Sequence, residues 1–370
     1  MRVRVDSTKN YNTIVVGGGQ SGLAIGYYLN RAGDNFLILD SGQAMGESWR
    51  NRYDSLVLFT PSQYDSLPGF EFPARTDTYP IKNEVANYIA AYAERFRLPV
   101  QLRTTVTHVA QSGCRFVVAT TRGTYTAAQV VIATGTMQCP FVPKYSNALA
   151  ADVFQIHSSG YRNPQQLVPG NVLVVGAGNS GAQIAAELSS DRQVYLAIGR
   201  EPRYVPQRFL GRDYLWWVIR LGMMDATPNS WPWGRMIRAT NSIVGTELRH
   251  KIRCGQVICT ARVVGIADDQ IYFADGTRQR FANVVWATGY KHDFTWIDAP
   301  IFDDDGQPIH RRGVTAVPGL YFLGLRWLHT GGSGFMGFVG RDAKYLDEQM
   351  TSRPAALASK KVIFPLSVGS

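Results

Sequence analysis

The chain has 370 residues, of which 45% are hydrophobic and 18% charged, so it can bury a large core and suggests two or three domains. Its formal net charge is +10, but lysine and arginine are spread along the sequence without a basic run, which excludes an obvious nucleic-acid-binding segment and favours phosphate-bearing cofactors. No apolar run is long enough to span a bilayer, and residues 1–12 lack the apolar core of a secretory signal, so we expect a cytoplasmic protein.

A glycine fingerprint opens the first unit. The apolar run at residues 13–16 predicts a strand that leads into Gly17-x-Gly19-x-x-Gly22, and residues 23–32 have the pattern of a helix. In such a fingerprint the first glycine permits a tight turn and the second lets the backbone approach a pyrophosphate. The third lets the helix pack closely on the strand. The pattern is weak alone, but the strand before it and the helix after it favour a dinucleotide site.

The next apolar run, residues 36–39, predicts a second strand that ends at Asp40. An acid at this place accepts hydrogen bonds from a ribose diol and repels a phosphate. The first site therefore suits FAD or NAD. Further along, a Gly turn near residues 121–124 suggests a β-meander, and the strand 130–132 closes the unit on Ala-Thr-Gly. The proline-containing stretch 136–169 is expected to be a linker.

The same order of elements recurs over residues 172–289. A strand leads into a second fingerprint with glycines at Gly176, Gly178 and Gly181, a β-meander is expected over 268–277, and the unit again closes on Ala-Thr-Gly. Roughly 115 residues separate the fingerprint from this closing strand in both copies. Matching order and spacing predict two related dinucleotide-binding units.

The second strand of the second unit runs toward Arg200, where the first unit has an acid. A guanidinium pairs with a 2′-phosphate, so the second site suits NADPH. Taken singly, Asp40 and Arg200 could each be a solvated surface charge. Their matched positions, about 24 residues after each fingerprint begins, favour the cofactor interpretation.

The residues after the second Ala-Thr-Gly belong to neither repeat, and the apolar run 319–324 predicts a strand that returns to the first sheet. We therefore predict an α/β fold of two Rossmann-like dinucleotide-binding domains with three-layer ββα construction, the NADPH domain being inserted in the FAD domain. Residues 1–150 form the first part of the FAD-binding domain, 151–289 the NADPH-binding domain and 290–370 the return segment of the FAD domain.

The four cysteines are Cys114, Cys139, Cys254 and Cys259, and none belongs to a C-x-x-C pair. This scatter fits reduced thiols and argues against a dithiol redox centre. The six histidines are also scattered, without the spacing of metal ligands, so no metal site is predicted.

The chain as a whole resembles the flavin-containing monooxygenase superfamily, the class B flavoprotein monooxygenases. It is most similar to the YUCCA-like branch and to bacterial flavoproteins associated with cation-efflux systems. The resemblance covers nearly the whole sequence and rests on Gly46-Glu-Ser-Trp49, Arg52-Tyr-Asp54, Ala133-Thr-Gly135 with Pro140, Gly176-Ala-Gly-Asn-Ser-Gly181 and Ala287-Thr-Gly-Tyr290.

By this resemblance the Gly-x-x-Trp segment lies along a flavin, while no catalytic residue is assigned. The predicted cofactor-binding residues, from both fingerprints and the resemblance, are Gly17, Gly19, Gln20, Ser21, Gly22, Asp40, Ser41, Gly46, Ser48, Trp49, Arg52, Val106, Ala133, Thr134, Gly135, Gly176, Gly178, Asn179, Ser180, Gly181, Arg200, Thr288, Gly289, Tyr290 and Gly324.

The sequence departs from the family pattern at two places. The fuller linker signature has Phe and Gly upstream of a His-Ser pair, whereas His157 and its serine follow Ala151 and Val153, which weakens an inference of Baeyer–Villiger chemistry. Several members also carry an Asn near the flavin where this chain has Phe59 and Thr60. We interpret His157 as a linker residue with local hydrogen bonds.

The resemblance implies an FAD-dependent and NADPH-dependent monooxygenase. Reduced flavin would capture O2 as a C4a-peroxyflavin and oxygenate a small organic substrate with a nitrogen, sulfur or 2-oxo-acid centre. Two alternatives remain: an NADPH oxidase or electron-transfer reductase without substrate oxygenation, and a non-enzymatic accessory protein, against which the intact fingerprints argue. Expected partners are a small-molecule substrate and O2, with no nucleic acid and no membrane span, and a homodimer is compatible with the sequence.

Two further segments carry open interpretations. Residues 213–224, which include Trp216 and Trp217, predict an aromatic-rich amphipathic helix that is core or a dimer contact, or else a substrate-channel wall or a membrane-touching helix. The glycines of residues 331–338 precede a helix-like run and fit a close backbone approach to the flavin.

Overall fold

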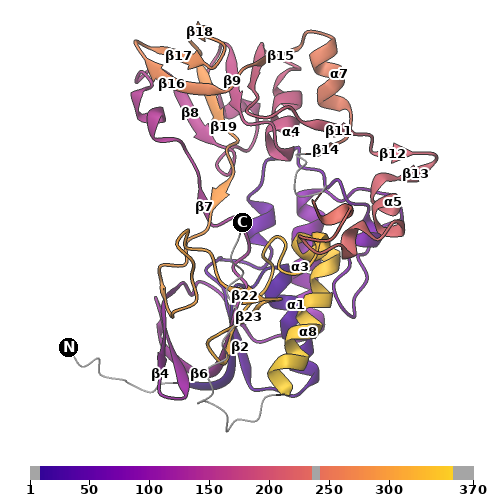
Figure 1. The fold of residues 1–370 in the computed structure, drawn as a ribbon, viewed down its shortest axis with the longest axis vertical. Coiled ribbons are helices and arrows are strands. Elements are labelled where there is room, and N and C mark those ends of the chain that lie inside the picture. The colour runs from indigo at the N-terminus through magenta and orange to yellow at the C-terminus, as the bar shows by residue number, and fades with distance from the viewer. Residues whose placement is uncertain (1–8, 236–241, 353–370) are drawn as a thin grey trace.

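The computed structural model describes residues 9–235 and 242–352. It contains two α/β units, and a narrow two-stranded ribbon lies between them (Figure 1). The ribbon pairs β7 (Cys139–Pro140) with β20 (Tyr290–Lys291) in antiparallel fashion, so the chain crosses from the first unit to the second and back at one place. The predicted pair of Rossmann-like units, one inserted in the other, is confirmed. The exact residue boundaries of the domains stay a prediction.

The first unit is built on a ten-stranded sheet. Its centre is β1, whose last four residues are fully buried and which pairs in parallel with β2 on one side and β6 on the other. The strands are β1 (Lys9–Val16), β2 (Phe36–Leu39), β3 (Val100–Gln101), β4 (Val106–Ser112), β5 (Arg115–Thr120), β6 (Gly123–Ile132), β21 (Ile297–Asp298), β22 (His310–Arg311), β23 (Val314–Thr315) and β24 (Leu320–Phe322).

The return strand predicted from the apolar run 319–324 is confirmed. β24 pairs in parallel with the end of β6, from Leu320 opposite Val130 to Phe322 opposite Ile132. The predicted meander is also present, as the antiparallel β4–β5–β6 arrangement. Because a parallel strand inside the sheet is covered on both faces, β2 and β24 are continuous buried apolar runs, whereas the antiparallel β5 alternates in burial.

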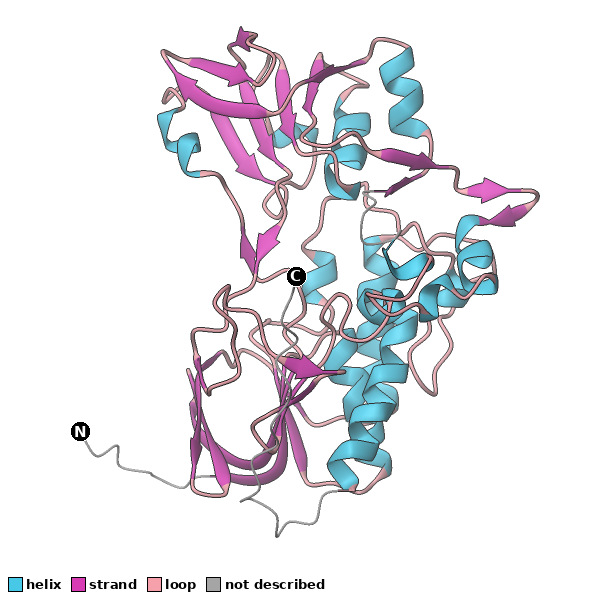
Figure 2. Ribbon diagram, viewed as in Figure 1, coloured by secondary structure: helices cyan, strands magenta, loops and turns pink. Residues whose placement is uncertain are grey.

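Helices cover one face of the first sheet (Figure 2), and α8 packs along α1. The helices and 3₁₀ turns of this unit are α1 (Gln20–Arg31), α2 (Glu47–Arg50), η1 (Ser62–Tyr64), α3 (Lys82–Arg95), η5 (Gly331–Gly334), η6 (Met336–Phe338) and α8 (Val339–Thr351). Helix α1 begins at Gln20, earlier than the predicted residue 23, because the last fingerprint residues themselves form its first turn.

The second unit has a five-stranded sheet in the order β15-β10-β9-β19-β8, in which every pair is parallel. Its elements are η2 (Lys144–Ala148), β8 (Phe154–His157), η3 (Pro164–Gln166), β9 (Val172–Val175), α4 (Asn179–Leu188), β10 (Val194–Ala197), α7 (Glu247–Arg253), β15 (Val257–Thr260), β16 (Val263–Ala267), β17 (Gln270–Phe273), β18 (Arg278–Gln279) and β19 (Asn283–Trp286). The strands β16 to β18 form the second predicted meander.

Between β10 and α7 the chain leaves this sheet and forms an extension. It consists of β11 (Arg203–Val205), β12 (Arg208–Phe209), β13 (Arg212–Asp213), α5 (Tyr214–Arg220), η4 (Met223–Asp225) and β14 (Ser242–Val244). The prediction of a single helix over residues 213–224 is therefore wrong in its length, because the segment divides into α5 and η4. Gly222 adopts a left-handed conformation with φ of 71°, which ends α5 and starts the separate turn η4.

Candidate cofactor sites

The three glycines of the first fingerprint meet three different surroundings. Gly17 has φ of 107°, and a Cβ there would lie 2.6 Å from the carbonyl oxygen of Ala133. A Cβ on Gly22 would overlap the carbonyl oxygen of Gly17, so helix and strand touch here. A Cβ on Gly19 would meet nothing within 4 Å. The first and third glycines are thus required by the protein's own packing, and the middle one faces open space.

The second fingerprint repeats this arrangement. Gly176 has φ of 108°, and a Cβ there would lie 2.5 Å from the carbonyl oxygen of Ala287. A Cβ on Gly181 would overlap the carbonyl oxygen of Gly176, whereas one on Gly178 would meet nothing within 4 Å. The two units therefore leave the same open space at the same place.

Each open space lies at the start of a helix. Gly19 is the residue before α1 and Gly178 is the residue before α4, and neither helix has a side-chain cap. The first N–H groups of a helix have no partner within it and carry partial positive charge. Unfilled space beside uncapped helix N-termini fits a diphosphate in both units.

Asp40 follows β2 and lies beside the first fingerprint. Its Oδ2 accepts a hydrogen bond from the Gly18 N–H at 2.6 Å, and its Oδ1 accepts one from the Gly42 N–H at 2.7 Å. The carboxylate therefore holds the fingerprint turn at Gly18 and also bonds to Gly42, just beyond the neighbouring Ser41. Since each carboxylate oxygen can accept a second bond, a ribose diol can still be recognised here.

The Gly-x-x-Trp segment lies next to the same fingerprint. The indole Nε1 of Trp49, at the end of the short helix α2, donates to Oε1 of Gln20 at 3.3 Å. Gly46 has φ of 76°, and a Cβ there would overlap the carbonyl oxygen of Ala86 in α3. Ser48 accepts at its carbonyl oxygen from Arg52 Nε at 3.3 Å.

The return segment contacts the first turn of α1, where the first site is predicted. Gly324, just after β24, has φ of 82°, and a Cβ there would overlap the hydroxyl oxygen of Ser21. Residues more than 300 positions apart in sequence thus meet at the first turn of α1. This explains physically why the last part of the chain has to return to the first sheet.

The closing Ala-Thr-Gly motifs contact the fingerprints or the linker. The Ala133 N–H donates to the carbonyl oxygen of Val16 at 2.8 Å, and the Thr134 hydroxyl accepts from Gln138 at 2.9 Å. The Thr288 hydroxyl donates to the carbonyl oxygen of Phe141 in the linker. Gly135 lies in the same turn and has φ of 71°.

Val106, in contrast, starts β4 and packs against the core of the first unit. No contact described for it in residues 9–235 and 242–352 reaches the fingerprint. The structure thus gives no support for Val106 as a binding residue, and its role stays a prediction.

Arg200 is exposed and follows β10 by three residues. The Gly176 N–H donates to the carbonyl oxygen of Ala197 at 3.0 Å, which places the end of β10 against the start of the second fingerprint. Arg200 therefore lies at the same edge of the sheet as Gly176. A group that recognises the 2′-phosphate of NADPH would have to lie at this edge. Asn179, Ser180 and Gly181 form the first turn of α4, directly after Gly178.

The two predicted sites meet at the junction between the units. Arg52 Nη1 donates to the hydroxyl oxygen of Tyr290 at 3.2 Å, and Arg52 also contacts Met137. His157 Nε2 lies 3.0 Å from the carbonyl oxygen of Gly289, and its ring is edge-on to the Tyr290 ring at 5.2 Å. Residues of the flavin-side motif and of the second Ala-Thr-Gly-Tyr motif are therefore in direct contact.

His157 is bonded at both ring nitrogens, since its Nδ1 lies 2.9 Å from the hydroxyl of Ser159. Burial lowers the pKa of His157, and the charge of Arg52 lowers it further, although the bond to Gly289 opposes the shift. The imidazole is thus engaged in hydrogen bonds, but the interpretation of His157 as a linker residue is wrong, because it ends β8 of the second sheet opposite Trp286 and its bond to Gly289 joins residues far apart in sequence.

Tyr53 and Asp54 lie at the junction, and no role was predicted for them from sequence. Tyr53 is 3% exposed and packs in the core of the second unit, and its hydroxyl donates to Gln183 in α4 at 2.6 Å. Asp54 bonds to Lys82 at 2.5 Å and to Asn163 at 2.8 Å, and these bonds lower its pKa. The signal in the sequence that could have pointed to these two residues is that they directly follow Arg52.

The glycine-rich stretch 331–338 has a second explanation besides approach to a cofactor. A Cβ on Gly337 would overlap the carbonyl oxygen of Tyr64, and one on Gly332 would lie 3.1 Å from the carbonyl oxygen of Met224. Gly337 is therefore required by packing within the protein, and Gly332 is closely packed. An approach of this segment to a flavin stays a prediction.

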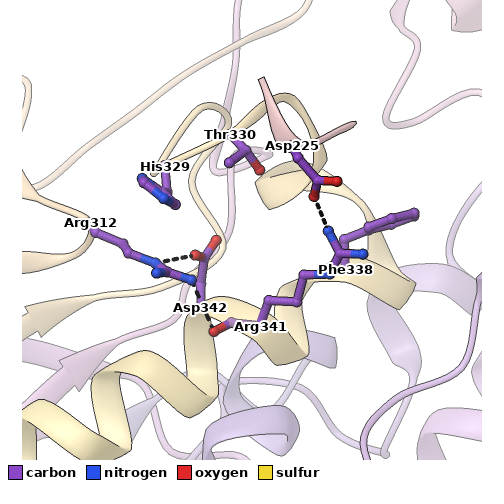
Figure 3. Close-up of a pocket in the computed structure, with 7 residues that line it drawn as sticks. All are labelled: Asp225, Arg312, His329, Thr330, Phe338, Arg341 and Asp342. Atoms are coloured by element: carbon purple, nitrogen blue, oxygen red, sulfur yellow. Dashed lines mark hydrogen bonds and ion pairs between the residues drawn. The ribbon is translucent and has the colours of Figure 1, made fainter. Parts of the chain in front are cut away.

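A small hollow of about 180 Å³ lies near the start of α8 (Figure 3). Arg312 pairs with Asp342 at 2.9 Å, and Arg341 pairs with Asp225. Each of the two guanidinium groups is therefore matched by a carboxylate. The hollow contains none of the predicted cofactor-binding residues.

The described residues contain neither a candidate metal site nor a disulfide. No group of three or more His, Cys, Asp or Glu side chains there could hold a metal ion. The four cysteines are free and exposed. None of the described helices is long and apolar enough to cross a membrane.

Comparison with known proteins places these features in a family. The family described as pyridine nucleotide-disulphide oxidoreductase matches residues 14–207. An uncharacterised CzcO-like oxidoreductase of Geobacillus kaustophilus is 45% identical over 90% of this chain and 97% of its own length. The indole-3-pyruvate monooxygenase YUCCA4 of Oryza sativa is 27% identical over 84% of this chain and 82% of its own length.

Solved structures agree with this placement. A flavin-containing monooxygenase from Stenotrophomonas maltophilia superposes with a TM-score of 0.79 at 29% identity, covering 93% of this chain and 99% of that one. The enzyme OTEMO, solved with FAD and NADP, has a TM-score of 0.69 at 15% identity, covering 93% of this chain and 86% of its own. The latter likeness shows a shared fold.

Proposed function

This chain belongs to the pyridine nucleotide-disulphide oxidoreductase family and to the flavin-containing monooxygenase superfamily, and from that premise we propose that it uses NADPH and O2 to oxygenate a small organic substrate. It is a flavoprotein oxidoreductase with FAD and NADPH as its cofactors. The substrate class we propose has a nitrogen, sulfur or 2-oxo-acid centre.

The observation that carries this proposal is the pair of equivalent open spaces at Gly19 and Gly178. The first has an acid, Asp40, at the end of the neighbouring strand, and the second has a base, Arg200, beyond the corresponding strand. The acid suits an unphosphorylated ribose and the base a 2′-phosphate. Two cofactors of different charge would thus each find a matching site.

The residues of the junction would orient the two cofactors. Bound FAD would accept a hydride from NADPH, and in its reduced form it would supply the electrons with which O2 is activated. Trp49 and Gln20 would hold the first cofactor beside α1, while Arg52 and Tyr290 tie this site to the second unit. Because no Ser-His-Asp or paired-carboxylate centre is proposed, positioning and exclusion of water are the contributions expected of the protein.

The free cysteines argue against a dithiol reductase within the same family. All four are exposed, and Cys254 lies near His250, with 3.6 Å between Sγ and Nε2, rather than near another cysteine. Thiol–disulfide exchange through a dithiol needs a second sulfur within reach of the first. Oxygen chemistry is therefore favoured over disulfide chemistry.

The test begins with the FAD-loaded protein, reduced by NADPH without oxygen and then mixed rapidly with oxygenated buffer. We expect a transient absorbance that differs from both the reduced and the oxidised flavin, because an oxygenating enzyme has to hold activated oxygen until the substrate reacts. Immediate return of the oxidised spectrum without a transient would instead support an oxidase or electron-transfer reductase. Protein that remains colourless after addition of FAD would overturn the assignment of the first site.

A further inference from the structure

A β-hairpin protrudes from the second unit at the outer edge of the molecule (Figure 1). It pairs β12 with β13, and its tip presents apolar side chains: Phe209 is 55% exposed and Leu210 is 74% exposed. Leu210 also has φ of 48°, a conformation that a branched side chain adopts at a cost. The tip is thus both apolar and exposed, which packing among residues 9–235 and 242–352 does not explain.

The hairpin is held rigidly by a buried acid at its base. Asp213 is 2% exposed and caps α5 by accepting from the Leu215 N–H at 2.6 Å. Its other oxygen accepts from the hydroxyl of Tyr79 at 2.7 Å and from Gln207 at 2.8 Å. The hairpin and α5 therefore form one fixed surface rather than a loose loop.

An apolar groove of about 390 Å³ lies where the hairpin meets α5. Aromatic and aliphatic side chains line it, among them Phe209, Trp217, Leu221 and Met223. The Trp217 indole N–H donates to the carbonyl oxygen of Phe209 at 2.9 Å, so its one polar atom is satisfied. Leu221 is 49% exposed at the end of α5. Phe209 of the hairpin and Leu221 of the helix end both line this groove, and the exposed Leu210 directly follows Phe209.

Positive charge surrounds this surface. Residues 208–221, which we name the hairpin–helix surface, contain three arginines, Arg208, Arg212 and Arg220, and all three are exposed. The one acid within these residues is the buried Asp213. Arg212 lies over the Trp216 ring at 5.5 Å, and Arg208 has a long contact of 3.5 Å with Asp77.

Exposed aromatic and aliphatic side chains flanked by arginines match the chemistry of an anionic lipid surface, where apolar groups enter the acyl boundary and guanidinium groups meet phosphates. A second copy of this chain fits less well, because a symmetric contact would bring like charges of the two hairpins together. We propose that the hairpin–helix surface docks the protein on anionic membranes. This inference is independent of the reaction that the cofactor sites perform.

The experiment measures cosedimentation of the FAD-loaded full-length protein with vesicles of phosphatidylcholine alone or with added phosphatidylglycerol. We expect binding to the anionic vesicles that weakens at least fivefold when salt is raised. L210D should reduce this binding at least tenfold and R212E at least threefold. The matched controls are V264D and R278E, which make the same changes at exposed positions of the second meander, and they should bind as the unchanged protein does.

Flavin content and thermal unfolding show that each variant is folded, and because Leu210 and Arg212 are exposed, folding should survive. Equal binding of L210D and V264D would overturn the proposal, as would failure of the unchanged protein to bind anionic vesicles. A dimer that L210D dissociates, without vesicle binding, would overturn it in favour of a second copy as occupant. Two results together would support the proposal: binding that requires phosphatidylglycerol, and loss of that binding in L210D but not in V264D.

Discussion

At the scale of single residues, Asp65 is a buried carboxyl that the cofactor sites do not explain. It is 2% exposed, and its Oδ1 accepts from the hydroxyl of Thr60 at 2.6 Å, while its Oδ2 has no hydrogen-bond partner among the described residues. Burial raises the pKa of Asp65 to about 7, and the bond from Thr60 opposes this shift. The folded protein therefore holds a proton here that the unfolded chain releases.

This proton makes stability depend on pH. Between the ordinary carboxyl pKa and a pKa of about 7, the folded state binds more protons at Asp65 than the unfolded state does. The contribution of Asp65 to stability is therefore greatest at low pH and falls as the pH rises. We expect the free energy of unfolding to fall by about 2.5 kcal/mol from pH 5 to pH 8, relative to Asp65→Asn. Urea unfolding at both pH values tests this. The exposed Asp304→Asn is the control, and an equal pH slope in all three proteins would contradict the prediction.

Arg200 decides between the two nicotinamide cofactors in our interpretation. The change Arg200→Glu should raise the KM for NADPH at least tenfold, about 1.4 kcal/mol, because a carboxylate repels the 2′-phosphate that the guanidinium would bind. The KM for NADH, which lacks that phosphate, should stay unchanged. Steady-state kinetics with both cofactors measures the difference, and Arg278→Glu controls for the change in net charge. Equal effects on NADPH and NADH would exclude contact with the phosphate.

At the scale of elements, each fingerprint divides its glycines between folding and binding. The third glycine lets the helix touch the strand, and the middle one leaves space beside the helix N-terminus. Sequence alone identifies three glycines at the right spacing. The structure adds that Gly22 and Gly181 are fixed by internal overlap, while Gly19 and Gly178 are not.

This division makes the two kinds of alanine substitution behave differently. Gly19→Ala should fold normally, because its added Cβ meets no atom within 4 Å and its φ of −76° suits any residue. It should nevertheless weaken FAD binding at least tenfold, because the methyl group fills the space for the diphosphate. Gly22→Ala should destabilise the fold by about 2 kcal/mol through the overlap with Gly17.

Titration of FAD into the apoprotein, together with thermal unfolding, measures both effects. Gly178→Ala is the matched variant of the second unit and should raise the KM for NADPH while FAD remains bound. If Gly19→Ala bound FAD as tightly as the unchanged protein, the open space in front of α1 would not be the diphosphate site.

At the scale of the whole molecule, the segment after α2 joins the two units. Tyr53 comes from the first unit but packs in the core of the second, and its hydroxyl bonds to Gln183 in α4. The Asp54 N–H donates to the carbonyl oxygen of Arg162, between β8 and η3 of the second unit, at 2.7 Å. A side chain shared in this way holds the second fingerprint in a fixed position relative to the first.

Removing this side chain should uncouple the two sites. Tyr53→Ala is expected to lower the rate of flavin reduction by NADPH at least tenfold, because the second unit is no longer held against the first, and to cost about 3 kcal/mol of stability. Tyr53→Phe keeps the ring and should cost about 1 kcal/mol with little effect on the rate. Anaerobic stopped-flow reduction and thermal unfolding test these expectations. Unchanged reduction in Tyr53→Ala would show that the coupling lies elsewhere.

The fold and the cofactor pair followed largely from sequence because their signals are local and periodic. A run such as Phe36–Leu39 reads as a buried strand, and a triple glycine between strand and helix reads as a phosphate turn wherever it occurs. The return strand was also predictable, since β24 is an apolar run with no partner in the second repeat. Chain order and side-chain type carry these signals without any knowledge of distant contacts.

Tertiary structure alone decided which residues meet across the chain. The contacts of Gly324 with Ser21, of Arg52 with Tyr290 and of Tyr53 with α4 join positions far apart in sequence, and no local pattern encodes such pairs. The same holds for the early end of α5, where packing and Gly222 override an amphipathic pattern that continues through η4. Hydrophobic periodicity specifies which face of an element is buried, but only the folded chain specifies what it is buried against.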